Sequence, residues 1–454
     1  MKKRLFLLIS LTLALALIAT ACGSGGGNAA SDAGATDSGL TSGGASDAEM
    51  TISVMYYDTG VPGGPVHPNT GEPSVLLSKH YPEIFSRTPN VTWEFEALQS
   101  ATEGYNSYLL RGASGTLPDL SLLDGYWVAA FASQNYTIPM EDVLPADKLD
   151  LVYPAFRNMY DGKTHGIVMS TAFNGVLWYR ESHLAELGLT MPPQSMEQLA
   201  DYAKQLTIPG ERYGLAMPMA KSEPTTVCLL GYYWGAQQPF VDSNNVAQFN
   251  NKTSIDLFNF LKTMYDDKSI PDESLTMSYE DAERMFTTGK ASILQHGSWL
   301  TGWDVRTPDF ADDIMVSPLP APAGGISSQN AGGWGLSVTT KDTAKYPAIA
   351  EFISVIILEP EFVKLRLTEC GELPVSSNFS PEDVDWIPEK YAKTIMDMLP
   401  DANTRPIVEV YPDASLEYCQ AMQEVVMNVK DAETALDDAV DRVAETARES
   451  GWGQ

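Results

Sequence analysis

Aromatic and polar residues that follow predicted strands are the side chains of this chain best suited to bind another molecule. Trp299 comes after the apolar run 290–294 and directly behind Gly297 and Ser298, so we expect it in a loop at the carboxyl end of a strand. In α/β proteins ligands bind at this end of the sheet. A flat ring stacks on an apolar face of a ligand, and carboxylates accept hydrogen bonds from its hydroxyl groups. The same position is predicted for Tyr57 and Asp58 after strand 50–56, and for Asp124, Tyr126 and Trp127 after strand 118–123.

Two further tryptophans lie among glycines. Trp334 stands between Gly333 and Gly335, and Trp234 belongs to a Gly-flanked aromatic cluster that also holds Tyr232 and Tyr233. Every one of these aromatic residues has an alternative role in the packed core. Truncation to alanine separates the two roles, because a binding residue costs affinity and a core residue costs stability.

Motifs of the common enzyme classes are absent from the sequence. It contains no P-loop, G-x-S-x-G, H-E-x-x-H, G-x-G-x-x-G or EF-hand loop. The histidines share no ligand spacing, so we expect no metal and no cofactor. The 59 acidic residues allow many carboxylate pairs, but no particular pair stands out for glycoside hydrolysis. The scattered histidines are His67, His80, His165, His183 and His296.

The N-terminus has the layout of an export signal. A basic start at 2–4 precedes an apolar stretch at 5–19, and small residues then precede Cys22. We predict a signal peptide at 1–21 and lipid (palmitate) on Cys22, although Ala19 stands where a lipobox usually has Leu. The alternative is cleavage near Ala21 without lipidation. The apolar stretch is shorter than the ~20 residues that a spanning helix needs.

Residues 22–49 are predicted to be a flexible linker, since Gly, Ser, Ala, Thr and Asp cannot bury enough surface to fold. A folded body tethered in this way would be secreted and held at the outer face of the cell membrane. Its formal charge of −30 disfavours nucleic acid and anionic lipid as partners. Cys228, Cys370 and Cys419 are an odd number, which indicates free thiols, with a Cys370–Cys419 bridge as the alternative.

The folded body alternates between strand and helix patterns. Predicted strands at 50–56, 91–98 and 118–123 are separated by helical segments at 75–85 and 105–112. This order predicts an α/β architecture with parallel sheets, and about 400 residues are enough for roughly two domains. Further helices are predicted at 195–206, 255–265, 278–289, 343–357 and 432–447, the first with a capping box of Ser195 and Gln198 and the third capped by Ser278 and Asp281.

Several different short motifs follow one another along the folded body. They are G-T-L-P-D-L at 115–120, D-G-K-T-H-G-I at 161–167, V-L-W-Y-R with L-A-E-L-G-L at 176–189, F-T-T-G-K-A-S-I with H-G-S-W at 286–299, the proline-rich stretch 318–322 with G-G-W-G-L at 332–336, A-E-F-I at 350–353 and G-E-L-P-V at 371–375. Each motif alone is weak. Together they resemble the bacterial extracellular solute-binding proteins of ABC importers, family 1, the class of maltose-binding protein, here in a lipoprotein form.

This resemblance implies a two-lobed periplasmic-binding-protein-like α/β fold with a hinged interlobe cleft. Chain crossings are expected near 171–175, 332–336 and 371–376, which puts Asn174 at the first crossing and Trp334 in a hinge. The family position of Trp299 is that of a stacking platform. Lobe one would comprise 50–171 plus 337–373, and lobe two 176–332 plus 378–452.

The function implied by the resemblance is capture of a small solute, expected to be a sugar or oligosaccharide, and its delivery to an ABC permease. The protein would act without catalysis and as a monomer. Alternatives are a non-sugar solute such as a peptide or polyamine, an extracellular glycoside-processing enzyme, and a lipoprotein that binds only proteins. Two departures from the family pattern are the long stretch from Gly60 to Pro73, which leaves the rim of the site uncertain, and Arg180 in place of Asn.

Overall fold

The computed structural model describes residues 49–57, 87–98, 101–302, 311–361, 363–364, 367, 371–379, 384–385 and 387–452. These residues belong to one compact unit that begins at Ala48. The predicted signal peptide, Cys22, the linker up to residue 48, Asp58, the helix at 75–85 and Cys370 lie outside the described residues. Within these ranges, no helix combines the length and apolar character needed to span a membrane.

The first sheet has six strands in the order β2-β1-β3-β12-β5-β4. β1 runs parallel to β2 and β3, as predicted, whereas β12 runs antiparallel to β3 and β5. The first sheet is therefore mixed and not parallel throughout, because β12 returns to it from a distant part of the chain. The strands are β1 Met50–Tyr57, β2 Val91–Leu98, β3 Leu120–Asp124, β4 Arg157–Tyr160, β5 Lys163–Val168 and β12 Trp334–Val338, and nearby helices are α2 Ala101–Ser114, α3 Val128–Ser133, α4 Ala146–Leu149 and α12 Tyr346–Leu358.

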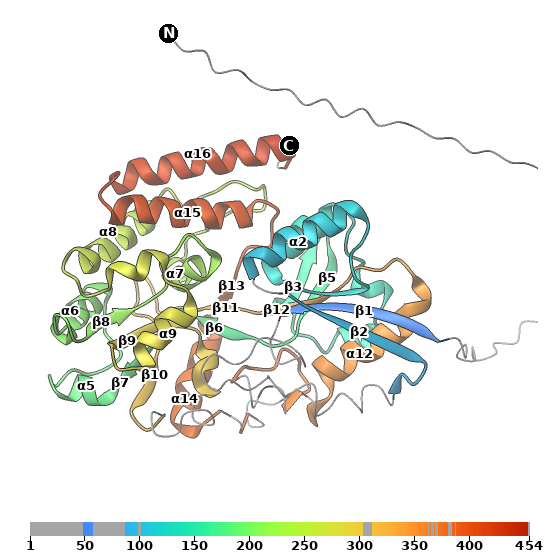
Figure 1. The fold of residues 1–454 in the computed structure, drawn as a ribbon, viewed down its shortest axis with the longest axis horizontal. Coiled ribbons are helices and arrows are strands. Elements are labelled where there is room, and N and C mark those ends of the chain that lie inside the picture. Colours follow the sequence, from blue (N-terminus) through green and yellow to red (C-terminus); the bar gives the residue numbers. More distant parts are fainter. Residues whose placement is uncertain are drawn as a thin grey trace, which may run out of the picture. The chain divides into compact units, whose positions relative to one another are not determined.

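The second sheet has four strands in the order β10-β7-β9-β8, and it lies apart from the first in Figure 1. Only β8 and β9 are parallel here. We call the first sheet with its helices lobe one, and the second sheet with its helices lobe two. The elements of lobe two are β7 Val176–Arg180, β8 Tyr213–Ala216, β9 Ala291–His296, β10 Ile314–Ser317, α5 Glu181–Ala185, α6 Met196–Leu206, α7 Glu223–Gly235, α8 Lys252–Asp266, α9 Tyr279–Thr287, α14 Glu389–Met398, α15 Tyr411–Val426 and α16 Ala432–Ser450.

A small third sheet lies between the other two (Figure 1). Its strands are β6 Ala172–Asn174, β11 Asn330–Gly332 and β13 Asn403–Thr404, in the order β13-β11-β6. Two of these strands coincide with the expected crossings near 171–175 and 332–336. Thr171 also pairs with Leu373, within the third expected crossing. The exact lobe boundaries stay a prediction, and β12 already enters the first sheet at Trp334 rather than at residue 337.

Local sequence signals account for the ends of several helices. The Ser195 hydroxyl accepts a hydrogen bond from the Gln198 amide at the start of α6. Ser278 and Asp281 form the capping box of α9. Asp431 caps α16, which ends at Gly451 in the left-handed conformation with φ 73°. Arg180, the departure from the family pattern, pairs with Asp313 and donates to the carbonyl of Phe286 at the end of α9.

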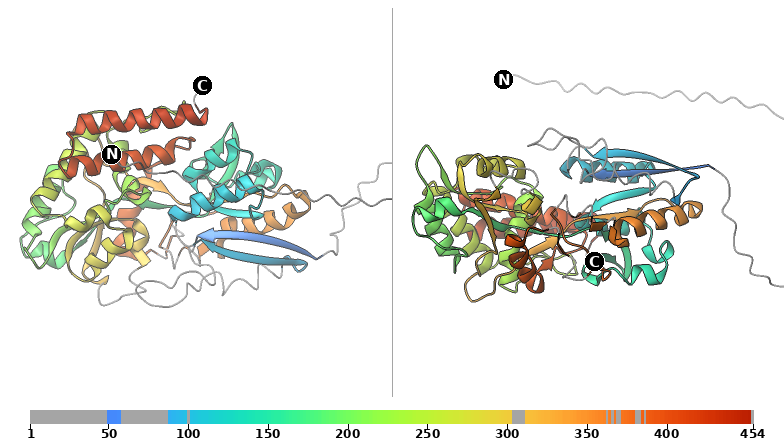
Figure 2. Two further views of the ribbon diagram at one scale, coloured as in Figure 1. Left: turned by 45° about the horizontal axis from the view of Figure 1, so that its top comes forward. Right: turned by 90° about the horizontal axis from the view of Figure 1, so that it is seen from below.

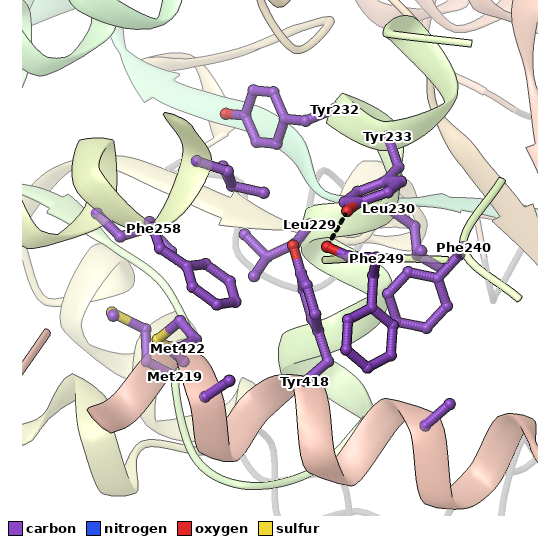
Figure 3. Packing of buried hydrophobic residues seen from close by; sticks show 14 of the residues in the cluster. Met219, Leu229, Leu230, Tyr232, Tyr233, Phe240, Phe249, Phe258, Tyr418 and Met422 are labelled. Atoms are coloured by element: carbon purple, nitrogen blue, oxygen red, sulfur yellow. Dashed lines mark hydrogen bonds between the residues drawn. The ribbon is translucent and has the colours of Figure 1, made fainter. Parts of the chain in front are cut away.

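Aromatic packing fixes the C-terminal helices to lobe two. α15 and α16 lie side by side in Figure 1 and in the left view of Figure 2. Tyr418 of α15 inserts among rings of lobe two, with its centroid 4.8 Å from that of Phe258 and 5.1 Å from that of Phe240 (Figure 3). The Tyr233 hydroxyl of α7 donates to the Phe249 carbonyl at 3.0 Å. This rigid packing holds the first residue of α15, Tyr411, beside lobe one.

Candidate functional site

The end of β3 brings four of the predicted residues together on lobe one. Asp124 is the last residue of β3, and Tyr126 and Trp127 form the short 3-10 helix that follows. Trp334 begins β12 directly opposite Asp124. The rings of Trp127 and Trp334 meet edge to face at 5.2 Å. Asp124, Tyr126 and Trp127 thus lie at the carboxyl end of β3 as expected, and Trp334 joins them because β12 runs antiparallel to β3.

These four residues differ in how far their side chains are exposed. Trp127 is 0% exposed, while Asp124 and Tyr126 are each 9% exposed. Trp334 keeps part of its side chain accessible. The structure therefore does not place Trp127 where a solute could reach its ring, and Trp127 instead supports Trp334 from behind.

Trp299 lies on lobe two in the short helix that follows β9, and its side chain is half-buried. Its ring meets that of Tyr279 edge to face at 5.4 Å. A Cβ atom on Gly297 would lie 1.9 Å from the Trp299 ring, so only glycine lets the ring lie across this turn. The G-x-W spacing in the sequence thus reflects a close packing between ring and backbone.

Asn174 lies in the third sheet, and Trp234 binds to a neighbouring strand of that sheet. Asn174 ends β6 and accepts a hydrogen bond from the Tyr279 hydroxyl at 3.1 Å. Its partner across the sheet is Asn330 of β11. The Trp234 indole donates to the Asn330 side-chain oxygen at 3.2 Å. One hydrogen bond thus links Trp234 of α7 to β11, and another links Asn174 of β6 to Tyr279 of α9.

His296 is buried beside Tyr279 and Trp299, and it is one of the histidines that share no ligand spacing. Its ring lies 4.5 Å from that of Tyr279 and 5.3 Å from that of Trp299. Burial lowers the pKa of His296 to about 3, so its imidazole is neutral at physiological pH. The His296 ring nitrogens and the Asn330 Nδ2 atom have no hydrogen-bond partner among the described residues. Buried polar atoms without a partner therefore lie beside the Trp299 ring on lobe two, at His296, and in the third sheet, at Asn330.

Arg405 occupies the lobe-one side, and sequence reasoning missed it. Its guanidinium forms two hydrogen bonds with the Asp124 carboxylate, one of them 3.2 Å long. It also donates to Glu223 at 3.1 Å and lies 4.7 Å above the Tyr126 ring. No local motif marks Arg405, because its partners are as many as 281 positions away in the chain.

The buried charges of Arg405, Asp124 and Glu223 form ion pairs with one another. Burial raises the pKa of Asp124 and of Glu223, against the opposing effect of Arg405. The two carboxylates in turn raise the pKa of Arg405, although burial alone would lower it. Glu223 also accepts hydrogen bonds from the hydroxyls of Tyr411, at 2.9 Å, and Ser415. The site consequently offers rings and amides to a ligand, and its carboxylates are already engaged.

Of the remaining predicted site residues, the structure describes only the backbone position of Tyr57, at the end of the strand that pairs with β3. Tyr57 ends β1 opposite Leu98, and Asp58 and Cys22 lie outside the described residues. Cys228 and Cys419 are buried free thiols whose pKa is raised to about 12 by burial, so Cys419 forms no disulfide. Across the described ranges, His, Cys, Asp and Glu side chains form no group of three or more that could hold a metal ion.

Hollows of very different volume occur in the described surface. A small hollow of about 20 Å³ beside the third sheet is lined by Tyr126, Gly332 and Arg405. Gly333 lines the same hollow, and a Cβ there would lie 2.3 Å from the Ser170 carbonyl oxygen. A larger hollow of about 630 Å³ lies between α6 and α8 and contains none of the predicted site residues. The volume of a hollow therefore does not identify the site, whereas the chemistry of the side chains around the third sheet does.

Proteins of known sequence and structure resemble this chain throughout its folded body. The Maltotriose-binding protein of Pyrococcus abyssi is 24% identical over 310 residues, which are 65% of this chain and 62% of that protein. The Lactose-binding protein of Rhizobium radiobacter is 24% identical over 277 residues, 58% of this chain and 62% of that protein.

Solved structures share the fold at similarly low identity. Maltose-bound MalE3 of T. maritima superposes with a TM-score of 0.74 at 20% identity, covering 87% of this chain and all of that one. MalE of Bdellovibrio bacteriovorus bound to maltotriose gives a TM-score of 0.72 at 20% identity, covering 88% of this chain and all of that one.

The family model described as "Bacterial extracellular solute-binding protein" matches residues 69–357. This range covers every strand of the two larger sheets except β1, together with β6 and β11 of the third sheet, and the shared fold agrees with it. The chain belongs to the family of bacterial extracellular solute-binding proteins.

Proposed function

We propose that this protein captures a neutral sugar or oligosaccharide between its two lobes and delivers it to an ABC permease. The observation that carries the proposal is that the rings of Trp299 on lobe two and Trp334 on lobe one are both half-buried and partly accessible, as is the side-chain amide of Asn174 at the end of β6. Aromatic rings suit the apolar C–H face of a sugar, and amides suit its hydroxyl groups. Sugar-binding relatives such as the maltotriose- and lactose-binding proteins support this solute class.

Electrostatics favours a neutral solute over a charged one. A polyamine or basic peptide would need carboxylates free to pair with it. Asp124 and Glu223 are instead engaged by Arg405 and by hydroxyl groups. For this reason we keep Trp299, Trp334, Asn174 and Trp234 as proposed solute contacts. We assign Asp124 a supporting role in place of the predicted direct contact.

A binding panel tests the proposal. Isothermal titration of the purified protein with maltotriose, lactose, spermidine and a basic peptide should give saturable binding to a neutral sugar and none to the cations. Saturable binding of spermidine or the peptide, without binding of any neutral sugar in a broader panel, would overturn it. Release of product from a chromogenic glycoside would instead support the enzyme alternative.

The membrane anchor is a second part of the proposal, and it rests on the sequence around Cys22. Wild-type protein should partition with membranes, whereas Cys22→Ala should be released or stall as precursor. Equal membrane retention of both forms in detergent partition would contradict lipidation. The lipid would keep the folded body beside the proposed permease.

A further inference from the structure

Residues 405–411 connect the hinge strand β13 to helix α15, and they contact both lobes. Two of their side chains, Arg405 and Glu409, each bind one residue of lobe one and one residue of lobe two. Arg405, Val410 and Tyr411 in this segment are buried. A short segment with two such bridges restrains how far the lobes can separate.

The first bridge is ionic. Arg405 joins Asp124, at the end of β3 in lobe one, to Glu223, the first residue of α7 in lobe two. A hydrogen bond weakens once its atoms move about 1 Å beyond normal range. Separation of β3 from α7 would therefore break one of the two pairs and leave a buried charge without its partner, which is strongly unfavourable.

The second bridge is a pair of hydrogen bonds to one carboxylate. The Tyr160 hydroxyl of β4 in lobe one donates to Glu409 at 3.0 Å. The Asn245 side-chain amide of lobe two donates to the other oxygen of Glu409 at 2.8 Å. The Asn245 side-chain oxygen accepts from the Val410 amide at 3.0 Å, which fixes the amide's orientation.

Ring packing closes the same interface. Tyr411, at the start of α15, meets Tyr126 of lobe one with ring centroids 5.4 Å apart. The Arg405 guanidinium lies over the ring of the same Tyr126. The aromatic rings thereby keep water away from the ionic bridge, where a low dielectric strengthens each charge interaction.

We infer that residues 405–411 form an interlobe strap in which Arg405 and Glu409 are positioning residues that set solute affinity without touching the solute. The strap stabilises the arrangement in which the two lobes are close, so it raises the fraction of molecules ready to bind. Apparent affinity scales with that fraction. The consequence for affinity rests on the proposed function, whereas the effect on lobe separation does not.

The test measures lobe separation in the absence of any solute. Spin labels on cysteines introduced at exposed Asp147 in lobe one and Glu211 in lobe two report the distance between the lobes. Glu409→Ala removes the second bridge, and Tyr160→Phe removes only its lobe-one end. Tyr346→Phe is the matched control, because its hydroxyl bonds to the Thr340 carbonyl within lobe one. Arg405→Lys keeps the charge but loses the paired geometry.

Glu409→Ala and Arg405→Lys should shift the distance distribution to longer values and raise the separated population about fivefold or more. Tyr160→Phe should shift it less, and Tyr346→Phe should leave it as in the wild type. Distributions identical to the wild type in Glu409→Ala and Tyr160→Phe, with both proteins folded by circular dichroism, would overturn the strap. Because no solute is present, this result is independent of whether the protein binds sugar.

Discussion

The two lobes place similar residue types beside the third sheet, but on lobe one these residues bond to one another, whereas on lobe two some stay accessible or unpaired. On lobe one, Asp124 and Tyr126 are buried and bound to Arg405. On lobe two, Trp299 is half-buried, and the buried ring of His296 keeps nitrogen atoms without partners among the described residues. The comparison teaches that a polar or aromatic residue after a strand can serve either structure or binding, and its long-range partners decide which.

The largest expected effect is on the lobe-one side. Arg405→Met would leave Asp124 and Glu223 buried without their cation. Breaking a buried ion pair in this way costs about 3–5 kcal/mol of unfolding free energy. Urea denaturation followed by circular dichroism measures the loss. A loss below about 1 kcal/mol, the range of surface ion pairs, would show that the charges are not buried as described.

A smaller effect is expected from Gly297→Ala on the lobe-two side. The added Cβ would fall 1.9 Å from the Trp299 ring and force that ring to move. Overpacking costs about 1–3 kcal/mol, and displacement of the ring should reduce sugar affinity about tenfold. Titration of the variant checks the affinity. Unchanged affinity would show that the ring position does not matter for binding.

A pH effect should distinguish His296 from the carboxylates. Its folded pKa of about 3 lies below the unfolded value of 6.5, so the unfolded state binds the proton more readily. Stability is then fully present above pH 6.5 and falls as the pH drops toward 3, with a slope approaching about 1.4 kcal/mol per pH unit. His296→Phe should flatten the slope between pH 6.5 and 5. Equal slopes in both proteins would contradict a buried neutral His296.

The smallest expected effect concerns salt. If the solute is neutral and the site charges pair with one another, affinity should change less than about twofold between low and high ionic strength, since salt screens only charges. Titrations at several salt concentrations check this. A steep decrease with salt would indicate a cationic solute and a lobe-one side that contacts it.

The sequence predicted the features that depend on local pattern. The capping residues Ser195 and Ser278 and the strands β1 to β3 follow from short-range patterns, whereas the chain crossings were expected from the family resemblance alone and stay a prediction. Strand β13 has two residues, too few to show a period. The direction of β12 depends on its distant neighbours β3 and β5, and local pattern carries no information about them.

The site could be predicted only as a set of candidates. Trp127 and Trp299 both follow strands, but only tertiary packing buries one ring under Trp334 and leaves the other half-exposed. Arg405 reaches Asp124 across 281 positions, which no local pattern records. The proposed solute contacts therefore stay predictions that substitution must test.

Trp299→Ala tests the central claim, that lobe two provides the ring on which a neutral sugar stacks. Titration with the sugar identified from the panel and thermal unfolding should be measured on the same preparations. Loss of an aromatic anchor costs about 2 kcal/mol or more, roughly a thirtyfold loss of affinity. The account predicts this loss with little change in melting temperature. Affinity near that of the wild type, with a stability loss of about 3–5 kcal/mol, would show a core tryptophan and contradict the account.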